Sequence, residues 1–506
     1  MLLIKNVQII DGTGKESYKA DVIVKDDHIS AIGNFASKKF GEIINGNGAY
    51  LSPGFIDVNS DSDHYLTLFT NPEQQDFLLQ GVTTIIGGNC GASLAPLTQG
   101  DPRSLRKWAD TNLINVGWHS MAEFLEIMEK RRLGVNFGTL VGHSTIRRDI
   151  IGEDIRDLTD KELAVFSAVL KRSLKEGAFG MSSGLGYVHS RLTPYYELKE
   201  LAALVAEYGG VYATHLRNEE DKLVGSVKET LELAAETGVT TIISHFRPLK
   251  GFEKEFAEAI LLIEKRAVDL NVFFDSYPSD RSIMTIYRLL PEWFQSGGFE
   301  IMARNILKPS IRERLTKELS GLNGEDITIA QASGHEFLVG KTLNEFAANR
   351  EIGVGEALVE LIDLTGFKTI VLYKNINIEP LKKAFSSRHA LIASNSASFL
   401  PSSKVARLER STNIFTKFIF MAEKDRADGQ VGGIFKLEEA IKKITSVPAS
   451  IFGLKKRGRI AEGNIADIAI FKDGEIKHVI VGGKTAVKDS NLQNVTAGKI
   501  LRHEEN

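Results

Sequence analysis

The chain has 506 residues, of which 43% are hydrophobic and 25% are charged, and its formal net charge at pH 7 is −3. This is the composition of an ordinary globular protein, and a charge so close to zero predicts neither a nucleic acid nor an anionic membrane as a partner. The single cysteine, Cys90, excludes an intrachain disulfide framework and suits a reducing compartment. Because the first residues lack the apolar core of a signal peptide and no apolar run reaches about 18 residues, we expect a cytoplasmic protein without a membrane span.

The two ends of the chain share one pattern, in which short apolar runs alternate with turn signals. Residues 1–50 contain several such runs, and residues 463–489 repeat the pattern around a hairpin turn at Lys472-Asp473-Gly474. The pattern suggests that residues 1–54 and 455–506 form one small β-sandwich domain.

The middle of the chain, residues 55–454, has a different rhythm, in which short β-branched runs alternate with amphipathic segments. One such segment begins after Thr159, a residue suited to cap a helix. There are eight apolar runs, namely GFIDV, TTIIGG, FGTLVG, AFGMSS, GVYAT, TTIIS, NVFFD and ALIAS. Eight strands with intervening helices predict the α/β class and a closed (β/α)8 barrel of the TIM type. The stretch 279–388 is too long for one helix and holds DITIAQASG and KTIVLYK, so we predict an inserted subdomain or lid there.

Polar residues directly follow most of the predicted barrel strands. In chain order they are Asn59 and Asp61, Cys90, His143, His215, His245, Tyr277 and Asn395. In a (β/α)8 barrel these positions converge at the C-terminal face, where such enzymes keep their chemistry. One histidine at a strand end is more often structural, but a series of strand ends with sulfur and nitrogen donors favours a functional site.

Three of these residues, Cys90, His215 and His245, predict a zinc site. A thiolate and two imidazoles suit Zn²⁺, and three protein ligands leave a fourth place for water, as in catalytic sites. Zinc lowers the pKa of such a water to about 7 and polarises a carbonyl. On its own Cys90 would more often be a small buried hydrophobic residue, and the two histidines are what favour the metal.

An ordered series of motifs extends over nearly the whole chain outside the insertion. It comprises PGFIDV at 53–58, GVTTIIGGNCGASLAP at 81–96, LVGHSTIR at 140–147, SSGLGY at 182–187, YATHLRNE at 212–219, ISHFR at 243–247, DSYP at 275–278 and the segment 438–471. This series resembles the N-acyl-D-amino-acid deacylase, or D-aminoacylase, family of the amidohydrolase superfamily. The resemblance implies a metal-dependent hydrolase of N-acyl-D-amino acids or related N-acyl compounds, and a small β-domain built from both termini.

The resemblance also implies roles for single residues. The family's tight zinc is held by a Cys and two His that match Cys90, His215 and His245. The His of the family's GHxT motif matches His143. Two tyrosines near the family's substrate match Tyr187 and Tyr277.

The chain departs from the family at two catalytic positions. The family's His-x-His pair is replaced by Asn59-Ser60-Asp61, so the imidazoles of a second, weaker metal site are missing and we expect one zinc. The family's general base, an Asp after the eighth strand, is replaced by Asn395, and an amide cannot accept a proton. Asp61 or Asp63 could serve as the base instead, and metal-activated water could retain some activity.

The chain also departs from the family at positions that would contact the substrate. Arg247 stands where the family typically has Lys, and Gly186 stands where it often has Glu. An arginine-containing stretch after the eighth strand is missing, and Lys404, Arg407 or Arg410 could replace its arginine, although a solvated helix face is the favoured interpretation.

Two hypotheses follow for the function. The first is a zinc-dependent amidohydrolase that acts on a small-molecule N-acyl amino acid or related amide, with Arg247, Tyr187 and Tyr277 binding the substrate. The second is a degenerate relative that keeps the fold and binds a ligand with weak turnover or none. Four further histidines are expected to be structural or at the surface: His64, His189, His335 and His389. The sequence predicts no oligomeric state.

Overall fold

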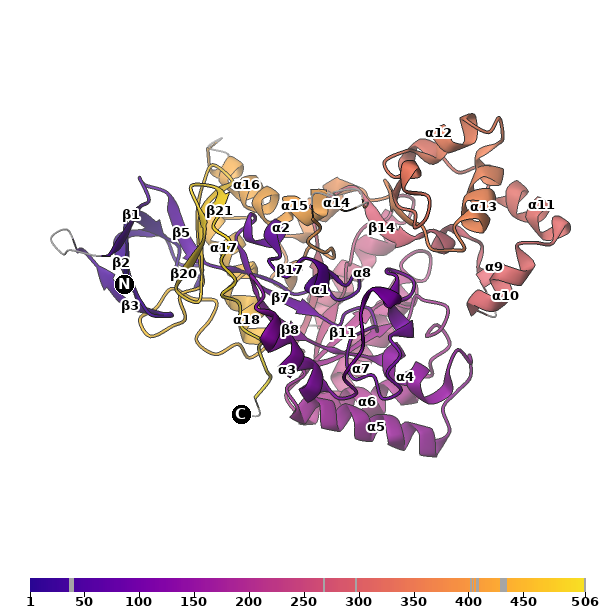
Figure 1. The fold of residues 1–506 in the computed structure, drawn as a ribbon, viewed down its shortest axis with the longest axis horizontal. Helices are drawn as coiled ribbons and strands as arrows, with labels where there is room; N and C mark the ends of the chain where they lie inside the picture. Colours follow the sequence, from indigo (N-terminus) through magenta and orange to yellow (C-terminus); the bar gives the residue numbers. More distant parts are fainter. Residues whose placement is uncertain are drawn as a thin grey trace.

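The computed structural model places the chain in three parts (Figure 1): a β-domain at one end, a barrel in the middle and a largely helical lobe at the other end. It describes residues 1–506 apart from 36–40, 267–268, 296–297, 401–402, 404, 406–408, 428–434 and 505–506. Within these described residues, no helix has the length and apolar character needed to span a membrane.

Both ends of the chain contribute to one nine-stranded sheet, in the order β21-β20-β19-β18-β5-β1-β2-β3 with β4 on β1. The strands are β1 (Leu2–Ile9), β2 (Tyr18–Lys25), β3 (His28–Gly33), β4 (Glu42–Asn45), β5 (Tyr50–Pro53), β18 (Ile468–Lys472), β19 (Glu475–Val481), β20 (Lys484–Lys488) and β21 (Asn491–Leu492). The two ends meet where β18 pairs antiparallel with β5. The predicted hairpin turn is confirmed, because Asp473 and Gly474 connect β18 to β19 with φ values of 53° and 73°, as a two-residue hairpin turn requires.

The barrel strands are parallel and occur where the eight apolar runs predicted them. They are β6 (Phe55–Asp57), β7 (Val82–Gly87), β8 (Asn136–Thr139), β9 (Val141–Gly142), β10 (Gly180–Gly184), β11 (Val211–His215), β12 (Thr240–Ile243), β13 (Val272–Ser276) and β17 (Ala390–Ile392). Leu140 alone separates β8 from β9, so the two occupy one strand position. A parallel bridge between Ser60 and Ser396 joins the first strand position to the last and closes the barrel. The predicted fold class is thereby confirmed.

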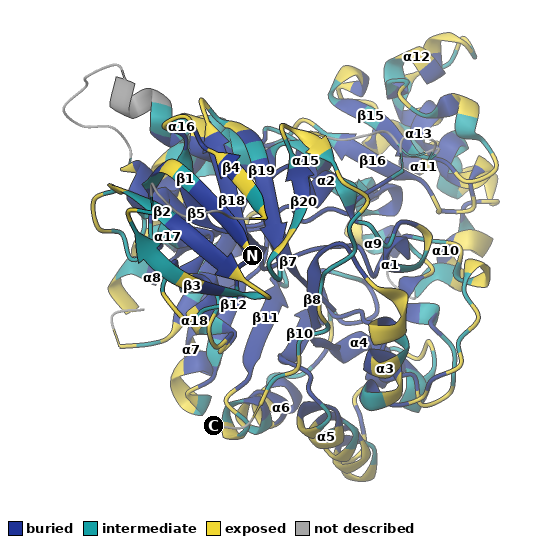
Figure 2. Cartoon of the chain, turned by 60° about the vertical axis from the view of Figure 1, so that its left-hand side comes forward, coloured by how far each residue is buried: buried dark blue, intermediate teal, exposed yellow. Residues whose placement is uncertain are grey.

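Helices surround the barrel, with exposed outer faces and buried inner faces (Figure 2). They are α1 (Thr67–Thr70), α2 (Gln75–Leu78), α3 (Met121–Arg131), α4 (His143–Ile151), α5 (Asp160–Lys175), α6 (Tyr195–Glu207), α7 (Leu223–Thr237), α8 (Glu253–Arg266), α14 (Ile378–Ala384), α15 (Glu409–Thr412), α16 (Ile414–Ala427), α17 (Leu437–Lys443) and α18 (Ser446–Ile451), with the 3₁₀ turns η1 (Arg103–Leu105) and η2 (Thr111–Leu113). The predicted cap of α5 is confirmed, because Thr159 Oγ1 accepts a bond from the backbone N–H of Glu162, whose carboxylate bonds back to the Thr159 N–H. This reciprocal pair is a capping box.

A lobe with its own hydrophobic core is inserted between β13 and β17. Its sheet has the order β14-β16-β15. Its elements are β14 (Ser282–Thr285), η3 (Ile286–Leu289), α9 (Glu292–Gln295), α10 (Gly298–Asn305), α11 (Pro309–Glu318), η4 (Gly324–Asp326), β15 (Ile327–Gln331), η5 (Glu336–Leu338), α12 (Leu343–Ala348), α13 (Val354–Leu364) and β16 (Ile370–Tyr373). The segments DITIAQASG and KTIVLYK provide β15 and β16, while α14, which lies inside the predicted range 279–388, packs against α8 of the barrel.

Candidate metal and active site

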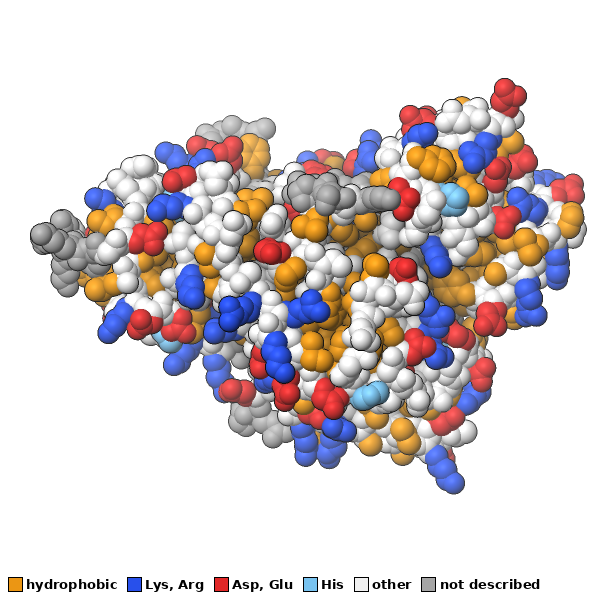
Figure 3. Space-filling view, viewed as in Figure 1, with side chains coloured by type: hydrophobic (Ala, Val, Ile, Leu, Met, Phe, Trp, Pro, Cys, Tyr) orange, Lys and Arg blue, Asp and Glu red, His pale blue; other side chains and the backbone are white. Residues whose placement is uncertain are grey.

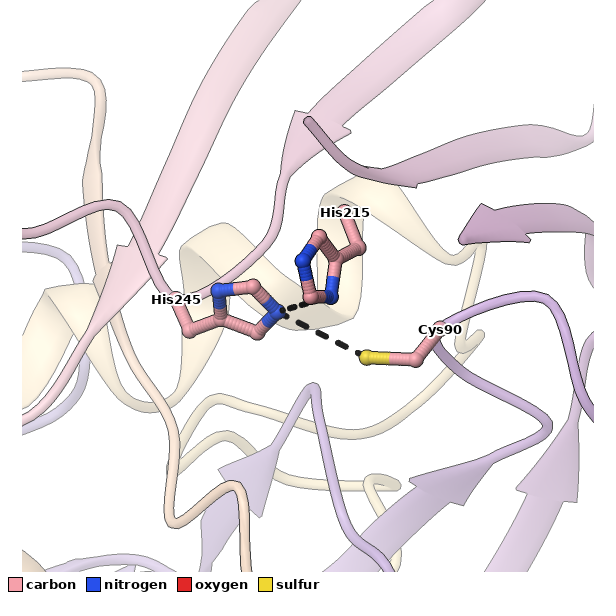
Figure 4. Close-up of side chains that lie close together, drawn as sticks. All are labelled: Cys90, His215 and His245. Carbon is pink, nitrogen blue, oxygen red and sulfur yellow. Dashed lines mark hydrogen bonds between the residues drawn. The ribbon is translucent and has the colours of Figure 1, made fainter. Parts of the chain in front are cut away.

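Cys90, His215 and His245 converge at the C-terminal ends of β7, β11 and β12 (Figure 4), where His215 is the last residue of β11. His245 Nε2 lies 3.6 Å from Cys90 Sγ and 3.1 Å from His215 Nδ1. The three ligand atoms all lie within 4.8 Å of one another, and the three side chains are buried. The barrel therefore gathers, around one point, residues that lie 155 positions apart in the chain.

These distances fit a tetrahedral zinc site. With Zn–N near 2.0 Å and Zn–S near 2.3 Å, tetrahedral angles separate two nitrogens by about 3.3 Å and a nitrogen from a sulfur by about 3.5 Å. The observed separations of 3.1 Å and 3.6 Å lie close to both values. The three residues could thus hold a metal ion, and one thiolate and two imidazoles are donors that suit Zn²⁺.

The backbone at the site is held in an uncommon conformation. Cys90, His245 and Asn395 have positive φ values of 50°, 41° and 44°, in the left-handed region that few residues other than glycine adopt. At His245 the surroundings enforce it, since its backbone N–H donates to Asp275 Oδ1 at 2.8 Å. Such strain is typical of functional sites, where the fold dictates where a side chain points.

Glu219 lies beside both imidazoles, although His215 Nε2 has no hydrogen-bond partner among the described residues. Its carboxylate lies 3.0 Å from His245 Nδ1, 3.5 Å from His215 Nε2 and 2.7 Å from Arg247 Nη1. Burial alone would raise the pKa of Glu219, but Arg247 and the two histidines outweigh it and hold the pKa well below its usual value. Arg247 Nη1 also lies 2.8 Å from His245 Nδ1, so a carboxylate and a guanidinium both meet this ring nitrogen.

Burial favours the neutral form of the His215 imidazole. Burial lowers its pKa to about 3, against the opposing pull of Glu219. The imidazole is therefore neutral at pH 7, and a neutral ring has a nitrogen lone pair to offer. Gly186 makes room for this ring, because a Cβ at position 186 would lie 2.5 Å from His215 Nε2, so the replacement of the family's Glu by Gly has a steric consequence here.

Asn395, which the resemblance matches to the family's catalytic Asp, lies beside a carboxylate. Asn395 Nδ2 donates to Asp61 Oδ2 at 3.4 Å, and Asp61 Oδ1 bonds to His64 Nδ1 at 3.0 Å. His64 stacks on Trp108 with ring centroids 4.1 Å apart. Although burial opposes it, the carboxylates of Asp63 and Asp61 raise the pKa of His64. His64 is buried and bonds to Asp61, so it helps to orient this carboxylate.

A small recess opens over these groups, with a volume of about 40 Å³. Its lining includes Asp61, Tyr65, Cys90, Trp108, Tyr187, His215, Glu219, His245, Arg247, Arg288 and Asn395. We call it the catalytic recess. Asp63 is absent from this lining, and its Oδ2 accepts a bond from the Gly88 N–H at 2.7 Å instead. Of the two alternative bases, only Asp61 faces the recess.

The other predicted site residues lie at different depths. Tyr187 lines the recess, and its ring centroid is 4.8 Å from that of His215. Arg247 also lines it, although Glu219 neutralises its charge. His143 and Tyr277 do not line it. His143 Nε2 bonds to Glu197 Oε1 at 2.8 Å at the start of α4, next to the ion pair of Arg147 with the same carboxylate.

Asn59 likewise points elsewhere. Its Nδ2 donates to Asp275 Oδ2 at 3.3 Å, so it supports the carboxylate that holds the His245 backbone. It does not line the recess.

The favoured interpretation of Arg410 as part of a solvated helix face is wrong. Arg410 is 1% exposed, its Nη2 donates to the Asn395 carbonyl at 2.6 Å, and its guanidinium lies 3.7 Å from the Tyr277 ring centroid. The carbonyls that follow β17 bind it inside the protein, which a helical pattern cannot reveal. Lys404 and Arg407, the alternatives, lie outside the described residues.

Two charged residues at the site were not predicted from the sequence. Glu219 belongs to the motif YATHLRNE, four residues after His215, so that spacing was an available signal. Arg288 comes from η3 of the lobe and lies 3.4 Å from Glu219 Oε2. No local pattern marks Arg288, because the lobe brings it to the recess from outside the barrel.

Comparisons with known proteins agree with this fold. The Amidohydrolase family model matches residues 305–486. The D-aminoacylase of Alcaligenes xylosoxydans xylosoxydans is 27% identical over 93% of this chain and 87% of its own length. The N-acyl-D-glutamate deacylase of the same organism is 26% identical over 99% of this chain and 96% of its own length. A crystal structure of the N-acyl-D-glutamate deacylase from Bordetella bronchiseptica, complexed with zinc and a phosphonate mimic of the tetrahedral intermediate, has a TM-score of 0.82 at 25% identity and covers 99% of both chains.

Proposed function

We propose that this chain, which belongs to the D-aminoacylase family of amidohydrolases, hydrolyses the amide bond of N-acyl-D-amino acids or related N-acyl compounds with one zinc ion. The observation that carries the proposal is the convergence of Cys90 Sγ, His215 Nδ1 and His245 Nε2 at distances suited to tetrahedral zinc. The proposal of a single ion is supported by Asn59, which the resemblance matches to a family histidine and whose amide bonds to Asp275 instead of offering an imidazole.

When bound, zinc would act as a Lewis acid toward the amide carbonyl and the attacking water. The chain's own residues supply the remaining chemistry. Glu219 would orient the His245 ring from 3.0 Å and lies 3.5 Å from His215 Nε2, and Asp275 holds the His245 backbone. These contacts preorganise the site, so the ligands need no rearrangement when the metal and the substrate bind.

Asp61 is the proposed general base in place of the family's Asp. Its carboxylate lines the recess, with Oδ1 bonded to His64 and Oδ2 facing the Asn395 amide. Asp61 Oδ2 would accept the proton of the attacking water and return it to the leaving amine. Asn395 would assist only as a hydrogen-bond donor, since its amide cannot take a proton.

Tyr187 and Arg247, which line the recess, are the proposed substrate contacts. Arg288 adds a further guanidinium on the lobe side of the recess. Tyr277 lies beneath Arg410 and His143 bonds to Glu197, so we assign both to support of the site.

The test combines metal content with an assay. The purified chain should hold about one zinc and should hydrolyse members of a panel of N-acyl-D-amino acids, with the L-enantiomers as controls. Cys90→Ala should abolish both zinc binding and hydrolysis. A native chain with no zinc, or with zinc but no turnover of any panel member, would overturn the proposal. The comparisons give no support to the degenerate alternative, which predicts the second of these outcomes.

A further inference from the structure

A second and larger cavity, which we call the outer chamber, lies beside the catalytic recess. Its volume is about 490 Å³, against about 40 Å³ for the recess, and Tyr187 lines both. Its walls come from the segment around η1, from α4 and residues 187–189 of the barrel, and from η3 and α10 of the lobe. Figure 3 shows basic and hydrophobic side chains together where the lobe meets the barrel.

The charges of the outer chamber favour an anion. Its lining includes the cationic residues Arg103, Arg106, Lys107, Arg148, Arg304 and Lys368. The carboxylates in the same lining are Glu153, Asp154 and Glu300. Two of the cations are paired, Arg148 with Glu153 at 3.1 Å and Arg103 with Asp101 at 2.7 Å. Even without Lys107, whose pKa is lowered by burial, the four arginines and Lys368 outnumber the three carboxylates, and this excess of positive charge attracts an anionic group.

Lys107 lies at the boundary between the two cavities. Its Nζ is 3.3 Å from the Tyr187 ring centroid and 3.9 Å from that of Trp108, and both rings line the catalytic recess. Among the described residues, no carboxylate lies within ion-pairing distance of this ammonium, and aromatic faces are its neighbours. Burial lowers the pKa of Lys107 well below its usual value, and a bound anion next to Nζ would favour the charged ammonium, so this side chain is placed to meet an anion that extends from the recess.

His189 supplies a second and independent observation. It is 6% exposed, it lines the outer chamber, and neither ring nitrogen has a hydrogen-bond partner in the described part of the chain. Its Nδ1 lies 4.0 Å from a Glu153 carboxylate oxygen, beyond hydrogen-bond reach. Buried polar groups are normally hydrogen-bonded. The free nitrogens therefore indicate a polar ligand, and burial, which lowers the pKa of His189 to about 2, keeps the ring neutral and able to donate from one nitrogen.

The volumes of the two cavities indicate that a single substrate would occupy both. Sites for small organic molecules generally occupy about 300–1,000 Å³, and the recess of about 40 Å³ holds no more than the reacting groups. The rest of an N-acyl amino acid has to extend past Tyr187, and the outer chamber offers the space.

We propose that the outer chamber binds a carboxylate at the far end of the substrate, contacted by Lys107, Arg148 and His189. This inference rests on the proposed function and narrows its substrate class to N-acyl-D-amino acids with a second carboxylate. That carboxylate belongs to the amino-acid side chain or to the acyl group, and each source has the same chemistry.

Matched substrate pairs test the inference and distinguish the sources. N-acetyl-D-glutamate is compared with N-acetyl-D-glutamine, and N-succinyl-D-leucine with its terminal amide. We expect kcat/KM to favour the carboxylate at least tenfold in one pair, which identifies the source. Lys107→Gln should bring that ratio toward one, and Arg148→Gln should reduce it. Lys161→Gln, an equal change of charge at an exposed position of α5 outside both cavities, should leave the ratio unchanged.

A binding measurement makes the result independent of turnover. Calorimetry of the zinc-loaded chain should show tighter binding of the preferred carboxylate than of its amide, and Lys107→Gln should remove the difference. Melting temperatures identify variants that fail to fold. If Arg148→Gln fails to fold, His189→Ala is measured in its place. The inference would be overturned if kcat/KM and binding were equal within both pairs and Lys107→Gln changed neither. In that case hydrolysis of the neutral members would still uphold the proposed function. Preferential carboxylate binding without any hydrolysis would support the chamber and overturn the proposed function.

Discussion

Asp61→Asn separates the proposed mechanism from its alternatives. The substitution preserves the shape of the side chain and can preserve the bond between its Oδ1 and His64, now 3.0 Å long. It removes the one property that Asn395 cannot supply at this place, a group able to accept a proton. If Asp61 is the base, the variant should fold, bind zinc and turn over slowly.

The expected loss can be worked out from the contacts. General-base catalysis contributes typically 10²–10⁴-fold, so the barrier should rise by about 2.7–5.4 kcal/mol at about 1.36 kcal/mol for each tenfold. In the folded state the substitution removes the 3.4 Å hydrogen bond from Asn395 Nδ2 to Asp61 Oδ2, because two amide groups then face each other. The loss of one hydrogen bond costs about 1 kcal/mol, which is small beside the expected effect on kcat.

The assay measures kcat and kcat/KM with the best substrate of the panel, with zinc content and melting temperature as controls. Asn395→Asp alone should gain little, because two carboxylates at this separation share one proton. The exchange Asp61→Asn with Asn395→Asp keeps one carboxylate and one amide, and should recover at least tenfold of the lost activity. Undiminished kcat in Asp61→Asn, or a large gain from Asn395→Asp in the native background, would refute the assignment of the base.

Further predictions concern the metal, its supporting carboxylate and the scaffold. Chelation should abolish the activity of the native chain and added zinc should restore it, whereas Cys90→Ala should show no restoration; a chain that stays active after full chelation contradicts the zinc site. Glu219→Gln should weaken zinc binding about 10–100-fold, since carboxylates behind ligand histidines contribute that much, as measured by competition with a zinc indicator; the exposed neighbour Glu220 provides the control variant Glu220→Gln. Thr159→Ala should lower the stability of the folded state by about 1 kcal/mol through loss of the α5 cap without changing kcat, and thermal melting that matches the native chain would count against that cap.

The barrel and the proposed zinc ligands followed from the sequence because both are encoded locally. A buried parallel strand reads as a short β-branched run, and the residue after it lies at the C-terminal face of any barrel. The sequence pattern therefore predicts that Cys90, His215 and His245 lie near one another, and the structure brings their ligand atoms within 4.8 Å. Turn and cap chemistry is equally local, which is why the Asp473-Gly474 hairpin and the Thr159 cap were predictable.

Only the tertiary structure decided which charged groups meet at the recess. Arg410 follows a helical pattern that suggests solvent, yet carbonyls after the last barrel strand bind it in the interior. Arg288 reaches Glu219 because the lobe folds over the barrel mouth, and Asp61 meets Asn395 because closure of the barrel joins positions 334 residues apart. The letter for an Asp, an Asn or an Arg is the same in the sequence whatever surrounds the side chain. The protonation and the partner of that side chain depend on burial and on long-range contacts that no local pattern contains.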